Sequence, residues 1–164
     1  MDTVPRLREL AALSVIALAI AACSTGATSP SPAEASPGAG GGTATTVAVT
    51  LQEWSVLAAP DSAPAGSVTF QVTNTGPEDV HEFVVLKTDL DPGALPVDAN
   101  GAVTEEGEGM EVVDEIEDVA VGTTQELTVT LAAGKYVLLC NIYDESDSEA
   151  HYTMGMRTAF TVGG

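Results

Sequence analysis

The residues best suited to chemistry lie together in the C-terminal stretch 134–162. They are Cys140, His151, Met154 and Met156. A cysteine thiolate, an imidazole and a thioether on one loop are ligands that suit a soft, redox-active metal ion. The chain has only two histidines, and the other one, His81, begins an apolar run, HEFVVL. We therefore expect His81 to complete a metal site with the loop residues.

Two imidazoles, one thiolate and a weak axial thioether make up the ligand set of a blue-copper site. The predicted ligands are His81, Cys140, His151 and Met156. Met154 is the alternative axial ligand. Such a set binds both Cu(I), which prefers sulfur, and Cu(II), which prefers nitrogen. Zinc could bind one cysteine and two histidines, but a methionine in the fourth position and an acidic loop do not favour a structural zinc site.

The elements that position these residues are short strands separated by turns. In the run SVTFQVT, Val68, Phe70 and Val72 alternate with polar residues, as expected for a half-buried strand. Strand-like segments are expected at 47–51, 54–58, 67–73, 81–87, 125–131, 136–142 and 158–162. This pattern predicts an all-β fold, an antiparallel β-sandwich. We expect one strand ligand and three loop ligands to link its two sheets at one end, and metal binding to weaken at low pH.

The segment 88–122 breaks the strand pattern. It begins with prolines and a glycine and continues into a run rich in glutamate and aspartate. Val112, Val113 and Ile116 have the spacing of one helical turn, so we expect a loop with a short helix or an extended segment lying across the sandwich. The acidic residues form either a solvated face, which is the commoner case, or a docking patch for a basic partner.

The N-terminus has the features of a targeting signal. Arg6 and Arg8 precede an apolar stretch, 10–22, that is too short to span a bilayer comfortably. The stretch ends in IAAC, which resembles a lipoprotein cleavage site, so Cys23 is the predicted lipidation site. Residues 1–22 are then a signal peptide, and 23–46, rich in serine, proline and glycine, a flexible linker. The alternative is an ordinary signal peptide that leaves Cys23 as a chance thiol.

Charge and cysteine content limit the partners. The net charge is −19, which argues against binding nucleic acid and permits a basic protein partner. The chain has two cysteines. If Cys23 carries lipid, Cys140 has no disulfide partner and is available to a metal, whereas without lipid a Cys23–Cys140 disulfide is the alternative. We expect an extracytoplasmic, membrane-anchored monomer with no small-molecule substrate.

Three motifs resemble the cupredoxins, the family of type 1 blue-copper proteins. They are NTGPEDVHEF at 74–83, GKYVLLCN at 134–141 and HYTMGM at 151–156, within a domain at 47–164. The resemblance implies a Greek-key β-sandwich and one type 1 copper centre, with His81, Cys140, His151 and Met156 as ligands. The chain departs from the family pattern in the ten residues between Cys140 and His151, in the lack of Pro-Gly after Cys140, and in Glu82 where many cupredoxins have asparagine.

These features predict a one-electron carrier that works with redox protein partners at the outer face of the cytoplasmic membrane. The alternative is a copper-binding module for delivery, storage or sensing, which the stretched acidic loop between Cys140 and His151 favours. Copper enzymes with several metal centres need more histidines than the two present, so we predict that the protein is not an enzyme. A metal-free sandwich used in adhesion is the remaining possibility.

Overall fold

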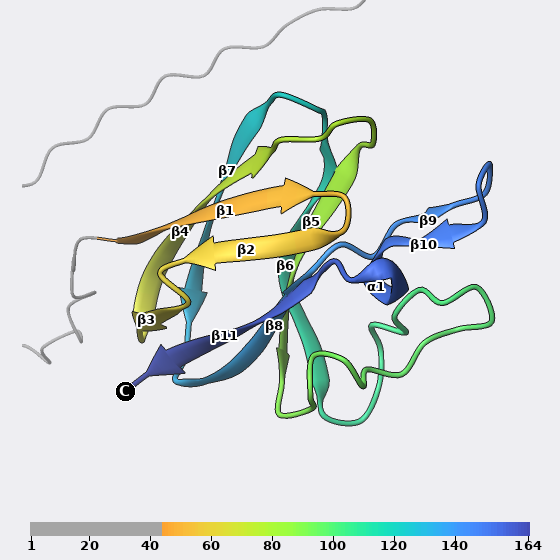
Figure 1. Ribbon diagram of the computed structural model, residues 1–164. Coiled ribbons are helices and arrows are strands. Elements are labelled where there is room, and N and C mark those ends of the chain that lie inside the picture. Colours follow the sequence, from red (N-terminus) through yellow and green to blue (C-terminus); the bar gives the residue numbers. More distant parts are fainter. Residues whose placement is uncertain (1–43) are drawn as a thin grey trace, which may run out of the picture. The chain divides into compact units, whose positions relative to one another are not determined.

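The computed structural model describes residues 44–164, which form two facing sheets (Figure 1). The predicted signal peptide and lipidation site, and the linker up to residue 43, lie outside the described residues. The strands are β1 (Thr45–Gln52), β2 (Ser55–Ala59), β3 (Ser62–Pro64), β4 (Gly66–Asn74), β5 (His81–Thr88), β6 (Met110–Val119), β7 (Thr124–Leu131), β8 (Gly134–Leu139), β9 (Tyr143–Asp144), β10 (Glu149–Ala150) and β11 (Arg157–Gly163). The one helix among these residues, α1 (His151–Met154), is a single turn. Nothing between residues 44 and 164 has the helical length and hydropathy of a membrane span.

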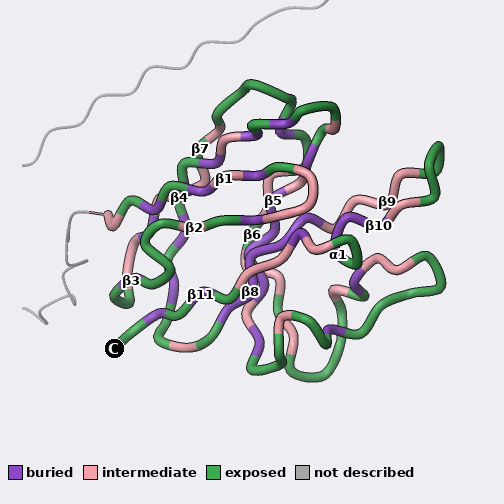
Figure 2. The backbone as a smooth tube through the Cα atoms, viewed as in Figure 1, coloured by how far each residue is buried: buried purple, intermediate pink, exposed green. Residues whose placement is uncertain are grey.

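The core lies between a four-stranded sheet, β2-β1-β4-β7, and a five-stranded sheet, β3-β11-β8-β5-β6. Alternation along β4 directs Val68, Phe70 and Val72 inward, and all three are fully buried. Phe70 contacts Phe83 and Phe160 of the opposite sheet at ring-centroid distances of 5.3 and 5.4 Å. Figure 2 shows buried residues concentrated on β5 and β8, and exposed residues both at the connecting turns and along strands such as β2 and β7. The predicted all-β sandwich is therefore confirmed.

The sheets differ from the expected antiparallel arrangement because each contains one parallel pair. β1 runs parallel to β4, and β3 runs parallel to β11. β1 and β2 form an antiparallel hairpin in the first sheet, and the chain then crosses to the second sheet at β3. The chain then returns to the first sheet as β4, which runs in the same direction as β1. The passage of β3 through the second sheet therefore accounts for the parallel pair in each sheet.

The expectation of a short helix within 88–122 is wrong, and the extended alternative is correct. Residues Met110–Val119 form β6, the edge strand paired with β5. The register shifts between Val85, which pairs with Asp114, and Leu86, which pairs with Val112, so Val113 is an extra residue on β6. Such a bulge interrupts the period of two. Val113 and Ile116 therefore both pack on the core, at a spacing that mimics a helix.

The rest of this segment, between β5 and β6, covers the outer face of the five-stranded sheet. Leu95 and Val103 pack there against Val84 and Leu139, together with Tyr152 of α1. The Tyr152 hydroxyl donates to the carbonyl of Pro92 (2.8 Å) and accepts from the N–H of Leu95 (3.0 Å). This cover explains why β5 is apolar along most of its length, because both of its faces are buried. It also fixes α1, which begins with His151.

Candidate metal centre

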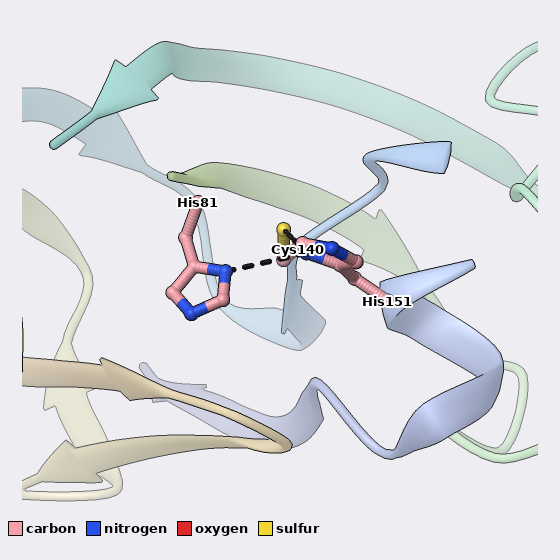
Figure 3. Close-up of side chains that lie close together, drawn as sticks. All are labelled: His81, Cys140 and His151. Carbon is pink, nitrogen blue, oxygen red and sulfur yellow. Dashed lines mark hydrogen bonds between the residues drawn. The ribbon is translucent and has the colours of Figure 1, made fainter. Parts of the chain in front are cut away.

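His81, Cys140 and His151 meet at one end of the sandwich (Figure 3). Their possible ligand atoms all lie within 4.8 Å of one another. The two Nδ1 atoms are 3.2 Å apart, and Cys140 Sγ lies 3.3 Å from His151 Nδ1. His81 and Cys140 are fully buried and His151 is 1% exposed. We call these three residues the His–Cys–His cluster.

All three residues belong to the five-stranded sheet or its connections. His81 opens β5, Cys140 directly follows the neighbouring strand β8, and His151 opens α1 just before β11. The expected link between the two sheets through the ligands is therefore wrong, because the pairing of β5 with β8 already brings His81 and Cys140 together. The other sheet reaches the cluster through the turn between β1 and β2.

Met156 lies beside the cluster and Met154 does not. The Met156 N–H donates to the carbonyl of His151 (3.0 Å), and its carbonyl accepts from the N–H of Cys140 (3.1 Å). Its side chain is fully buried in the core that also contains Cys140. Met154 is 43% exposed. The structure thus favours Met156 over Met154 as the thioether that belongs to the site.

Gly155 makes this arrangement possible. Its φ is 131°, which side-chain-bearing residues rarely adopt, and a Cβ there would lie 2.8 Å from the carbonyl oxygen of Trp54. The chain can therefore turn from α1 to Met156 in close contact with the β1–β2 turn.

The ten residues between Cys140 and His151 form a hairpin. β9 pairs with β10, and the His151 N–H donates to the carbonyl of Ile142 (2.9 Å) at its base. At its tip, Asp144 Oδ1 accepts from both the N–H and the hydroxyl of Ser146 (2.7 Å each). Figure 1 shows this hairpin projecting away from the sheets. The ten residues thus lie outside the cluster, and the paired base of the hairpin brings His151 back close to Cys140.

Several solved structures share this architecture. The auracyanin of the photosynthetic bacterium Roseiflexus castenholzii is 23% identical with a TM-score of 0.52, covering 75% of this chain and 100% of that one. Auracyanin B is 22% identical with a TM-score of 0.51, covering 74% and 90%. Rusticyanin from Thiobacillus ferrooxidans is 18% identical with a TM-score of 0.52, covering 74% and 78%. No protein-family profile matches the chain, and no curated protein matches it.

The chain has the cupredoxin fold. The predicted fold class is thereby confirmed, and the cluster occupies the end of this cupredoxin fold where β5 begins and β8 ends.

Burial sets the protonation of the cluster. It lowers the pKa of both histidines, and the neighbouring His151 lowers the pKa of His81 further, so both imidazoles are neutral near neutral pH. Burial also raises the pKa of the Cys140 thiol to about 12. The Glu82 N–H donates to Cys140 Sγ (3.2 Å) and favours the thiolate once a cation displaces the proton. Neutral imidazoles and a buried thiol beside a buried thioether fit a soft transition-metal ion.

Asn74 anchors the loop that leads to His81. It is fully buried, and its Nδ2 donates to the carbonyls of Asp79 (2.7 Å) and Val119 (2.8 Å). Its Oδ1 accepts from the N–H of Gly76 (2.8 Å). The sequence motif at 74–83 includes Asn74 but assigns it no role, although an asparagine two residues before a glycine is a signal of such a side-chain-to-backbone bond.

Glu82 and Asn141 link the His–Cys–His cluster to the segment between β5 and β6. Glu82 Oε2 accepts from the N–H of Asn141 (3.1 Å), next to Cys140. The Asn141 side chain accepts from the Val103 N–H (2.6 Å) and donates to the Val103 carbonyl (3.0 Å) and to Glu105 Oε1 (2.8 Å). Burial, aided by nearby acidic residues, raises the pKa of Glu82 to about 7. Glu82 thus connects β5 to the residue after Cys140.

Trp54 covers the cluster from the opposite sheet. It lies in the turn between β1 and β2, and its ring meets the His151 ring edge-on at a centroid distance of 5.2 Å. Trp54 is half-buried, whereas His151 is buried. The sequence carries no signal for this contact, because it depends on how the two sheets face each other.

Proposed function

We propose that this protein is a one-electron carrier that binds a single copper ion through His81, Cys140, His151 and Met156. The observation that carries the proposal is the buried His–Cys–His cluster, with Met156 beside it, at one end of a cupredoxin fold. Bound copper would supply a Cu(I)/Cu(II) couple that exchanges one electron.

The residues of the chain hold the site in one arrangement. Backbone bonds join Met156 to both Cys140 and His151, and the side-chain bonds of Asn74 hold the loop before His81. Because every ligand segment is held by these bonds, the ligands have little freedom to rearrange between oxidation states. Such rigidity favours rapid electron exchange.

The proposed place of action is the outer face of the cytoplasmic membrane. It rests on the lipidation signal at Cys23 and on the linker that follows. The net charge of −19 and the acidic edge strand β6 support a basic redox partner. The auracyanin of Roseiflexus castenholzii has been studied in a dithionite-reduced form, which is redox chemistry of that protein and supports the same class of function here.

Copper delivery or storage is the second candidate, and exposed Met154 favours it. A surface thioether three residues from His151 could offer copper a first contact. Two rates distinguish the candidates in the copper-loaded full-length protein: electron self-exchange, and copper transfer to a Cu(I) chelator. We expect fast self-exchange and slow transfer. The reverse pattern would select delivery, and a colourless adduct without a reversible one-electron couple would contradict the electron-carrier proposal.

A further inference from the structure

Glu53 reaches the His–Cys–His cluster from the four-stranded sheet, which contributes no ligand. It lies in the turn between β1 and β2, and its side chain is only 11% exposed. Its Oε1 accepts from the N–H groups of Glu78 (3.0 Å) and Asp79 (2.8 Å), just before His81. The carboxylate is therefore held in place by the loop that carries the ligand.

Two buried polar atoms without hydrogen-bond partners lie on this pair of side chains. They are Nε2 of His81 and Oε2 of Glu53. Nε2 lies 3.8 Å from Glu53 Oε1, slightly beyond hydrogen-bond distance. One is a possible N–H donor and the other is an acceptor, and a buried donor without an acceptor costs free energy. A slightly shorter separation would bring Nε2 within hydrogen-bond distance of the carboxylate.

The two nitrogens of His81 have different surroundings. Nδ1 faces His151, whereas Nε2 points away from the cluster (Figure 3). The backbone N–H groups of Glu78 and Asp79 both donate to Glu53 Oε1, which suits an acceptor-only carboxylate at this position. A carboxylate beside Nε2 favours the tautomer with the proton on that atom and leaves the Nδ1 lone pair directed into the cluster.

We propose that Glu53 is a positioning residue that accepts the Nε2–H of His81, fixes the ring with Nδ1 toward the metal site, and places a negative charge behind that ligand. A carboxylate that orients a metal-bound histidine raises its basicity as a ligand. The charge also stabilises the more positive oxidation state of a bound ion relative to the less positive one. This inference rests on the proposed copper function, but its first test does not require copper.

The first test reads the His81 tautomer by nitrogen-15 NMR in the metal-free, full-length wild-type protein. We expect one tautomer, with the proton on Nε2. A proton on Nδ1, or an even mixture of the two forms, would overturn the proposal whether or not the protein binds copper. Because this measurement uses the wild-type chain, it does not depend on a variant that folds.

The second test compares Glu53→Gln with the control Glu78→Gln. The amide introduced by Glu53→Gln can still accept the two backbone N–H groups but carries no charge. Glu78 is an exposed carboxylate on the loop before His81. A charge close to an ionising group changes its equilibrium by about one to three powers of ten. We expect Glu53→Gln to lower the ratio of Cu(II) to Cu(I) affinity about tenfold, which raises the potential by about 59 mV.

The control should change that ratio far less, and the Glu53→Gln variant should also populate the second His81 tautomer. Equal shifts in the two variants would overturn the proposal, because the effect would then be one of general charge. If neither the wild type nor a variant binds copper, the proposed function fails, and the tautomer measurement still decides the role of Glu53.

Discussion

Replacing Asn74 by alanine tests how strongly the loop before His81 is anchored. The substitution removes one buried bond to the Val119 carbonyl, one buried bond from the Gly76 N–H and one partly buried bond to the Asp79 carbonyl. A buried group left without its partner costs about 1–3 kcal/mol. We therefore expect Asn74→Ala to lower the free energy of unfolding by about 3–5 kcal/mol.

Urea unfolding of the metal-free protein measures this loss. With an m-value of about 2 kcal/mol/M, the midpoint should fall by about 2 M. Asn74→Asp keeps the acceptor for Gly76 but turns an oxygen toward two carbonyls, so it should be at least as destabilising although it leaves no cavity. Gln71 lies on the same strand as Asn74, and Gln71→Ala removes only an exposed hydrogen bond to Glu126. This control should cost less than about 0.5 kcal/mol. If Asn74→Ala costs less than about 1 kcal/mol, the loop is not held by this side chain.

Three further predictions concern the site itself. Gly155→Ala should destabilise the protein by about 2 kcal/mol or more in thermal unfolding, because it combines a φ of 131° with a Cβ that would lie 2.8 Å from the Trp54 carbonyl. The control Gly109→Ala, at a φ of 79° with open space around it, should cost less. Equal losses in the two variants would contradict the contact with Trp54. Copper(I) affinity, measured by chelator competition, should rise about tenfold per pH unit above about pH 7. Binding displaces one proton from the Cys140 thiol, whose pKa is about 12, whereas both imidazoles have lowered pKa values and are already neutral. A flat profile would exclude Cys140 as a ligand. Emission from Trp54, the only tryptophan, should be strongly quenched when Cu(II) binds, because its ring lies 5.2 Å from that of His151, and unchanged emission at full loading would contradict this geometry.

The sandwich and the members of the cluster were predictable because their signals are local or rare. Strict alternation in β4 identifies a half-buried strand whatever its partners are. A chain with only two histidines and two cysteines leaves few combinations for a soft-metal site. These local signals could not reveal that β1 and β4 are parallel, because that direction depends on β3 crossing to the other sheet.

Features that depend on contacts between distant segments were not predictable. The bulge at Val113 gives β6 a spacing that resembles a helix, and only its pairing with β5 distinguishes the two. Trp54 was expected to begin a strand-like segment at 54–58, but it lies in the turn before β2. Its contact with His151, and that of Glu53 with His81, form only because the two sheets face each other. The insertion after Cys140 suggested an open loop, but the pairing of β9 with β10 closes it into a hairpin.

The proposed copper site depends on Cys140 acting as a thiolate ligand, and its spectrum tests this most directly. Cu(II) is added to the full-length chain carrying Cys23→Ser, in which Cys140 is the only thiol, and visible absorption and electron paramagnetic resonance spectra are recorded. The same measurement is made with Cys140→Ser added. We predict an intense visible thiolate-to-copper band in the first protein and none in the second. Identical spectra from the two proteins, with or without a band, would contradict the proposed site.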